Sequence, residues 1–154
     1  MMNLTLRPVT GENFNQVVKL SETLTDYQKT CVAPNMVSLA QAYVHYDKAW
    51  PRAIYVDEEV VGFVMLALYD DDIPQEDQPA YFLWRFMMAK DHQQKGYGRK
   101  VLDLIVDKCK EDRIKSLYTS AEYQGEQPLK FYLSYGFKDT GIIDDGEKVL
   151  RFEI

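Results

Sequence analysis

A short stretch with two glycines carries the clearest chemical signal in the sequence. Residues 92–102 read HQQKGYGRKVL, in which Gln93, Gly96 and Gly98 form the pattern Q-x-x-G-x-G. The stretch lies between an apolar run and an amphipathic pattern, where a helix is expected to begin. The amides of a first helical turn attract anions, and glycine allows a ligand to approach the backbone closely. Three basic residues share the segment: Lys95, Arg99 and Lys100. Their charge suits a phosphate-bearing cofactor.

The glycine turn has other interpretations. A P-loop needs Gly-x4-Gly-Lys-Ser/Thr, and the sequence contains no such run. A dinucleotide fingerprint needs a third glycine where Val101 stands, within a series of parallel βαβ units that the pattern of elements does not provide. A glycine turn that follows a strand without binding any ligand is as well supported by this stretch alone.

The elements that would position this turn lie on both sides of it. The segment YFLWRFMMA, residues 81–89, is apolar on both faces and predicts a central strand. A helix is expected from about Gln94 to Asp112, with one apolar stripe and basic residues near its end. SLYTSAEY, residues 116–123, predicts another strand. EQPLKFYLSYGF, residues 126–137, predicts a helix that ends at Gly136.

The remaining elements complete one predicted sheet. LTLRPV, residues 4–9, predicts a strand, and a helix is expected to follow up to about Leu24. TDYQKTCVAPN, residues 25–35, is interpreted as an irregular connector to a second helical region that Pro51 ends. RAIYV and VVGFVMLALY predict antiparallel strands, and KVLRFEI closes the sheet. The pattern β-α-α-β-β-β-α-β-α-β-β predicts an α/β fold with a mixed sheet, in a single domain over residues 1–154.

Composition narrows the range of partners. The net charge of −6 argues against nucleic acid, whose binding needs a basic surface. It fits a small cationic partner, although excess acid often serves only solubility. No apolar run is long enough to span a bilayer, so no membrane partner is expected. Cys31 and Cys109 form no CxxC, and Cys109, on the apolar stripe of a predicted helix, is expected to be a reduced core thiol, which indicates a cytoplasmic protein. His45 and His92 lack a ligand cluster, so no metal site is expected.

Two stretches resemble the GCN5-related N-acetyltransferase (GNAT) superfamily, namely WRFMMAKDHQQKGYGRKVL and EQPLKFYLSYGF. The similarity runs through the whole chain. VAPNMVSLAQAY, AIYVDEEVVGFVM and YFLWRFMM make the chain most similar to bacterial spermine/spermidine acetyltransferases. The resemblance implies the GNAT acyl-CoA N-acyltransferase fold, with a central pair of strands that splay apart, and acetyl-CoA as the co-substrate.

The resemblance also implies roles on the cofactor side. Phe86, Met87 and Met88 would offer backbone groups to pantetheine, and Tyr132 would protonate the departing CoA thiolate. The pyrophosphate would lie on the loop formed by Gln93, Gln94, Lys95, Gly96, Tyr97, Gly98 and Arg99. Many family members carry an asparagine where this chain has Gly125, so a side-chain contact with the cofactor is lost, while the backbone there is still expected to face it. Tyr132 could instead be an aromatic residue that only packs on the sheet.

The acceptor amine is expected across the cleft from the cofactor. Polyamine nitrogens have pKa values near ~10, so the site must attract a cation and remove a proton. The candidate contacts are Glu22, Asp26, Tyr27 and Trp84. Some polyamine acetyltransferases carry a glutamate base at the position of Trp84, so a water chain to Glu22 or Asp26 is expected instead. Trp84 could pack on the acceptor's methylenes, make a cation–π contact or belong to the core. The acidic loop, residues 70–77, could rim the cleft or simply be solvated.

The predicted reaction is direct transfer of the acetyl group of acetyl-CoA to a primary amine in a ternary complex. The preferred acceptor is a polyamine such as spermine or spermidine. An amide near Met88 would polarise the thioester carbonyl. The alternatives are an aminoglycoside, an amino acid or a protein N-terminus as the acceptor, or a catalytically silent acyl-CoA-binding module. Superfamily members often dimerise, so a homodimer is also expected.

Overall fold

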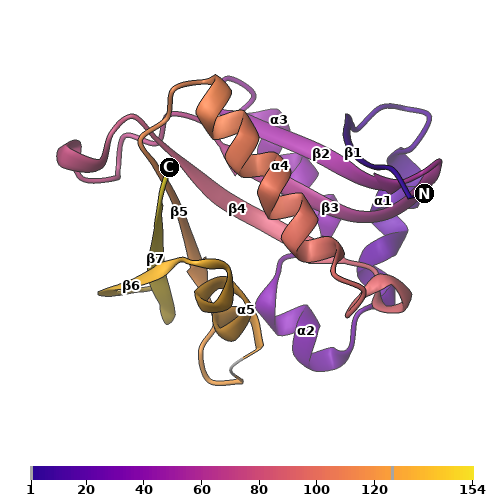
Figure 1. Ribbon diagram of the computed structural model, residues 1–154. Helices are drawn as coiled ribbons and strands as arrows, with labels where there is room; N and C mark the ends of the chain where they lie inside the picture. Colours follow the sequence, from indigo (N-terminus) through magenta and orange to yellow (C-terminus); the bar gives the residue numbers. More distant parts are fainter. Residues whose placement is uncertain (1, 126) are drawn as a thin grey trace.

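One mixed sheet runs across the molecule (Figure 1). The computed structural model describes residues 2–125 and 127–154, and its strands lie edge to edge in the order β1-β2-β3-β4-β5-β7-β6. The strands are β1 (Leu4–Pro8), β2 (Ala49–Val56), β3 (Glu59–Ala67), β4 (Ala80–Met88), β5 (Ser116–Ala121), β6 (Lys138–Asp144) and β7 (Glu147–Glu153). Neighbouring strands are antiparallel except β4 and β5, which are parallel. The predicted mixed sheet is therefore confirmed.

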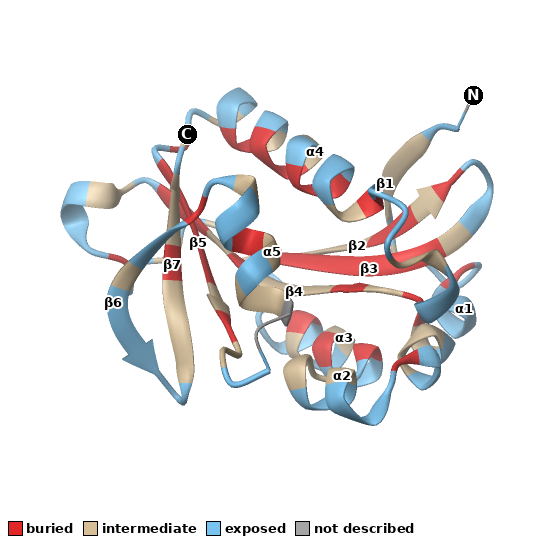
Figure 2. Ribbon diagram, turned by 60° about the horizontal axis from the view of Figure 1, so that its bottom comes forward, coloured by how far each residue is buried: buried red, intermediate tan, exposed pale blue. Residues whose placement is uncertain are grey.

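Helices cover both faces of this sheet (Figure 2). They are α1 (Phe14–Lys19), α2 (Asp26–Cys31), α3 (Asn35–Val44), α4 (Tyr97–Glu111) and α5 (Gln127–Tyr135), with short 3-10 helices η1 (Leu20–Thr23), η2 (Gln75–Asp77) and η3 (Lys90–His92). On one face α4 buries Leu102 in a cluster with Leu66 of β3. On the other face α1 and α3 bury Val17 and Ala42 with Phe63 of β3. Among the helices described, none is long and apolar enough to cross a membrane.

The parallel strands β4 and β5 separate halfway along their length. They pair only from Ala80 with Ser116 to Leu83 with Thr119. Beyond that point β4 pairs with β3 alone, and β5 continues beside β7. The backbone edge of β4 that faces β5 is consequently free to bind another molecule. The splayed pair of strands expected from the resemblance is present.

A β-bulge lies at the point where the two strands separate. Leu66 of β3 pairs with Leu83 and Met65 pairs with Arg85, so Trp84 is the additional residue on β4. A bulge breaks the alternation of side chains along a strand. Arg85 donates a hydrogen bond to Gln41 of α3, and Trp84 packs with the cluster under α1 and α3. Both side chains therefore lie on the face opposite α4.

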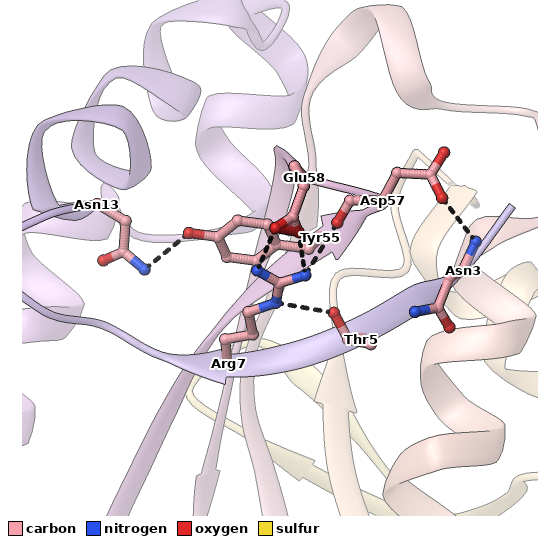
Figure 3. A network of polar contacts seen from close by, with 7 residues as sticks. All are labelled: Asn3, Thr5, Arg7, Asn13, Tyr55, Asp57 and Glu58. Carbon is pink, nitrogen blue, oxygen red and sulfur yellow. Dashed lines mark hydrogen bonds and ion pairs between the residues drawn. The ribbon is translucent and has the colours of Figure 1, made fainter.

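The β1 edge of the sheet is held by a polar network far along the sheet from this separation (Figure 3). Arg7 of β1 donates to Glu58 Oε2 at 2.6 Å and to the Asp57 carbonyl at 3.0 Å, and its guanidinium stacks 4.1 Å from the ring centre of Tyr55. Tyr55 in turn accepts a hydrogen bond from Asn13, just before α1. The network ties β1 to the β2–β3 turn and to the start of α1.

The segment predicted to be an irregular connector contains a helix, so this prediction was wrong. Thr25 caps α2: its hydroxyl accepts from the Gln28 amide, and the Gln28 side chain accepts from the Thr25 amide. Such a capping box compensates for the unpaired amides of a first turn. The helix has six residues and no buried side chain, so it lacks the apolar periodicity on which the prediction depended.

Two further boundaries differ from the predictions. Pro51 lies inside β2 and does not end the preceding region. The sheet accommodates Pro51 because the pairing of β2 with β1 ends at Arg52. On the β1 side of Pro51 there is therefore no paired strand that would need the N–H that proline lacks. Helix α4 begins at Tyr97 and not near Gln94. Gly96 and Gln94 both take positive φ angles, of 81° and 60°, which a continuing α-helix does not allow.

Candidate active site

A large cleft opens where β4 and β5 separate, with a volume of about 1090 Å³. It is lined by Phe82–Met88 of β4, by His92–Gln94 and Gly96–Arg99 ahead of and within α4, by Thr119–Glu122, by Pro128, Phe131 and Tyr132 of α5, by Tyr27–Ala33, and by Asp144, Asp145 and Glu147. Segments far apart in the sequence therefore meet around one cavity. The volume is at the upper end for small-molecule sites.

The N-terminus of α4 faces this cleft as the sequence predicts. Gly96 is its N-cap in the left-handed conformation, at φ 81°, which glycine adopts without steric cost. The helix has 15 residues and no acidic residue in its first turn, so its free amides and dipole favour an anion there. Tyr97, Gly98 and Arg99 line the cleft, whereas Lys95 is not among the described residues that do.

Gln93 holds the motif loop in place. Its Nε2 donates to the Met88 carbonyl at 3.0 Å, and its Oε1 accepts from Gln28 Nε2 at 2.9 Å. The side chain thus joins the loop to the end of β4 and to α2. Its amide group already has partners in the protein, so any contact of Gln93 with an anion is more readily made by its backbone.

Gly98 is required by packing between helices. A Cβ at this position would lie 3.0 Å from Cζ of Phe131 on α5, closer than normal van der Waals contact. Phe131 also packs against Phe86 of β4, with 6.2 Å between the ring centres. The glycine therefore lets α5 approach α4 and close one end of the cleft.

Tyr132 is buried at the base of the cleft, with 8% of its surface exposed. Its ring packs against Phe131 and Phe137, each at 5.3 Å between centres. Burial raises the pKa of its hydroxyl, a hydrogen bond with Thr119 opposes that shift, and the charge of Glu147 adds to it. The net effect raises the pKa, so the phenol remains protonated at neutral pH and can donate a proton.

The three predicted residues of the cofactor strand all line the cleft. Phe86 points toward α4 and α5, in the cluster that contains Tyr132. Met87 is buried on the opposite face with Phe63, and its sulfur accepts a hydrogen bond from Asn35. Met88 presents its carbonyl to Gln93. The alternation brings both faces of β4 and its free backbone edge to the cavity.

The predicted acceptor residues separate into two groups. Tyr27 and Trp84 line the cleft, but Glu22 and Asp26 are not among the described residues that do. Glu22 lies in η1, and Asp26 is the first residue of α2, where an acidic side chain suits the helix dipole. The water chain to either carboxylate therefore has no support from this geometry.

The acidic loop also has other partners. Asp71 forms an ion pair with Lys48 at 2.9 Å, and Asp77 forms one with Arg151 at 3.0 Å. Tyr118 also donates a hydrogen bond to Asp77. The described residues that line the cleft include none from residues 70–77. Through Asp77 of η2, this loop is bound to β5 and β7, and its described residues do not rim the cavity.

Four other carboxylates line the cleft: Glu122, Asp144, Asp145 and Glu147. None of the four was predicted from the sequence as a site residue. Three of them, Asp144, Asp145 and Glu147, belong to the DDGE turn at residues 144–147, in which Asp145 and Gly146 have the positive φ angles of a tight hairpin. Glu122 directly follows β5. Only the placement of β7 between β5 and β6 brings that turn to the mouth of the cleft.

Gly125 lies beside Tyr27. A Cβ at this position would lie only 1.8 Å from the Tyr27 hydroxyl oxygen, so the tyrosine occupies the space that a side chain would need. The glycine that departs from the family pattern is thus matched by an aromatic residue of α2. Tyr27 lines the cleft, whereas Gly125 is not among the described residues that do.

Gly125→Asn is expected to displace the Tyr27 ring and to lower kcat/KM several-fold. Tyr27→Ala is expected to have a similar effect, and the double variant is expected to be no worse than either single one. The coupling free energy from this double-mutant cycle should be about 0.5–1.5 kcal/mol. Additive losses, measured by steady-state kinetics, would contradict a shared role.

A family model described as acetyltransferase (GNAT) family matches residues 20–137, and the chain belongs to this family. It is an acetyl-CoA-dependent N-acetyltransferase.

Particular relatives share its full length. The spermine/spermidine N(1)-acetyltransferase of Bacillus subtilis (strain 168) is 27% identical over 156 residues, which cover 99% of this chain and 100% of that protein. The PaiA N-acetyltransferase of Thermoplasma acidophilum in complex with coenzyme A has the same fold, with a TM-score of 0.71, 14% identity and 99% of each chain covered. So does the aminoglycoside acetyltransferase AAC(6')-Ib in complex with coenzyme A, with a TM-score of 0.75, 17% identity, and 98% and 95% covered.

The cleft has the features that acetyl-CoA requires. The free edge of β4 offers amides and carbonyls to an extended amide-bearing arm. The N-terminus of α4 and the nearby Arg99 suit a pyrophosphate. Tyr132 holds a proton at the base of the cavity. Acetyl-CoA is the co-substrate and supplies an activated acetyl thioester.

Proposed function

We propose that the protein transfers the acetyl group of acetyl-CoA to a primary amine of a polyamine such as spermine or spermidine. The observation that carries the proposal is the set of four carboxylates on the cleft, Glu122, Asp144, Asp145 and Glu147. An extended polycation has several charges to place, and separated carboxylates attract them. The names of the curated relatives support the same acceptor.

The aromatic wall of the cleft adds to this proposal. Trp84 lies in the bulge of β4, on the face opposite α4, and lines the cavity. Its ring could receive the methylenes between two charged nitrogens, or one of the cations directly. Cys31 and Val32 line the cleft near Tyr27, so apolar surface is available between the charged groups.

We propose direct transfer in a ternary complex. The neutral amine attacks the thioester carbonyl, which an amide near Met88 polarises, and Tyr132 donates its proton to the departing sulfur. The free edge of β4 leaves amides there without a strand partner. The model that the chain is a silent acyl-CoA-binding module predicts no turnover with any amine.

One observation favours a second acceptor class. Arg85 lines the cleft, and of its nitrogens Nε is buried without a hydrogen-bond partner among the described residues. Its guanidinium donates to Gln41 and to the Trp84 carbonyl but pairs with no carboxylate there. A cation of this kind would suit the carboxylate of an amino acid acceptor.

A panel of amines discriminates between these acceptors. Release of free CoA thiol is measured with spermine, spermidine, an aminoglycoside and several amino acids at equal concentration. We expect kcat/KM for a polyamine to exceed the others by about tenfold or more, and its KM to rise with salt as the charges are screened. A preferred amino acid would overturn the polyamine and support the role of Arg85.

A further inference from the structure

Glu147 occupies a distinctive position among the carboxylates of the cleft. It is the first residue of β7 and is half-buried. Its Oε1 accepts a hydrogen bond from the Ser120 hydroxyl at 2.8 Å. Ser120 lies on β5 immediately beyond Thr119, the last residue that pairs with β4. The bonded pair is therefore located where the two strands begin to separate.

The charge of Glu147 reaches both walls of the cleft. On α5, burial raises the pKa of Tyr132 and Glu147 raises it further. On β4, burial lowers the pKa of Arg85 and Glu147 opposes that shift. These two residues come from different elements, and the carboxylate is close enough to act on each. Glu147, Tyr132 and Arg85 all line the same cleft.

The other acidic residues of the cleft are less suited to receive a proton. Glu122 accepts a hydrogen bond from the backbone amide of Gln124 at 2.7 Å and so holds the loop ahead of α5. Asp144, the cross-strand partner of Glu147, and Asp145 are exposed at the hairpin turn. These positions suit attraction of distal positive charges.

We propose that Ser120 and Glu147 form the proton relay that activates the acceptor amine, a role that rests on the proposed acetyl transfer. The ammonium nitrogen gives one proton to Ser120 Oγ as the hydroxyl proton passes to Glu147. The neutral nitrogen then attacks the thioester carbonyl. As the carbon–sulfur bond breaks, Tyr132 protonates the thiolate and recovers a proton from the nitrogen that has become an amide. Glu147 releases its proton to solvent.

The relay accounts for the arrangement of charges around it. Ser120 of β5 is bonded to Glu147, Asp144 of β6 is its cross-strand partner, and Arg85 of β4 and Tyr132 of α5 line the same cleft. The neighbouring Lys148 is bound to Asp139 at 3.0 Å and does not neutralise Glu147. A carboxylate bonded to a hydroxyl at the separation of the strands is thus available to accept a proton, while burial, with a smaller contribution from the same negative charge, raises the pKa of Tyr132 and keeps it protonated.

The test compares Glu147→Gln and Ser120→Ala with Glu153→Gln, an exposed carboxylate on the same strand. At pH 7 we expect kcat/KM to fall about 100-fold in Glu147→Gln and at least tenfold in Ser120→Ala. As the pH is raised toward the pKa of the amine, the fraction of neutral amine increases about tenfold per pH unit, and kcat/KM of both variants should increase by the same factor. Glu153→Gln should keep the wild-type rate and pH profile. Calorimetric binding of CoA should be unchanged in all three.

Several outcomes would overturn the relay. One is a loss in Glu147→Gln that is equal at every pH, and another is wild-type activity in that variant. A third is a higher KM for the amine with an unchanged pH profile, which would assign Glu147 to cation binding alone. The measurements use whichever amine the wild type acetylates. A non-polyamine acceptor would therefore refute the proposed substrate while still testing the relay.

Discussion

Tyr132→Phe is expected to lower kcat by about 100- to 1000-fold, the range in which a general acid contributes. The ring is packed between Phe131 and Phe137, so phenylalanine retains the packing and loses only the hydroxyl. The raised pKa of that hydroxyl means that it carries its proton throughout the neutral range. Rapid-quench or steady-state assays measure the loss, and calorimetry with acetyl-CoA should give an unchanged Kd.

Tyr135→Phe is the matched control for this substitution. Tyr135 lies on the same helix, but its hydroxyl donates to Asp103 at 2.7 Å, and among the described residues it does not line the cleft. Its kcat should stay within about twofold of the wild type. If Tyr132→Phe retained more than a third of the wild-type kcat, Tyr132 would not be the proton donor, and a water molecule or another group would have to protonate sulfur.

Gly62→Ala is expected to destabilise the protein by about 3 kcal/mol and to weaken acetyl-CoA binding. A Cβ on Gly62 would lie 2.6 Å from the Met87 carbonyl oxygen and 2.9 Å from the Met88 sulfur. The first of these atoms belongs to the backbone of β4, so relief of the clash must move the strand segment that lines the cleft. Overpacking of this kind commonly costs about 1–3 kcal/mol. Tm should fall by roughly 6–12 °C.

Gly11→Ala provides the comparison, because a Cβ there would meet nothing within 4 Å. Its Tm is expected to stay within about 2 °C of the wild type. Thermal unfolding followed by circular dichroism measures both variants, and calorimetry measures their Kd for acetyl-CoA. A Gly62→Ala protein with wild-type Tm and Kd would show that β4 moves freely at this point, contrary to the close contact between the strands.

Local patterns in the sequence were sufficient to predict the glycine turn and the helix that begins after it. The Q-x-x-G-x-G stretch lies next to a helix, and the special conformation of Gly96 and the free amides after it depend only on neighbouring residues. Tyr132 was identified from its own helix and the resemblance of the surrounding stretch. The mixed sheet followed from the alternation and length of its strands. Features that arise within about fifteen consecutive residues leave a readable pattern.

Short or weakly amphipathic segments were harder to predict. Helix α2 has no buried residue, so hydrophobic periodicity gave no sign of it, although Thr25 and Gln28 form its capping box. Pro51 was predicted to end the preceding region because proline disrupts regular structure. Its place inside β2 is allowed by its lack of a β1 partner, and the register between strands that leaves it unpaired cannot be read from the local sequence. In both cases the deciding contacts were outside the pattern on which the prediction depended.

The carboxylates of the cleft were identified only from the tertiary structure. Glu22 and Asp26 were selected by their position in the chain, yet the cleft contains Glu147, which is more than 100 residues away in the sequence. Glu147 reaches Ser120 because β7 inserts between β5 and β6. The sequence by itself determined the family, the fold and the glycine turn that leads into α4, because those are encoded in contiguous segments. The tertiary structure decided which carboxylates line the cleft, because strand order and the separation of β4 from β5 depend on contacts between distant parts of the chain.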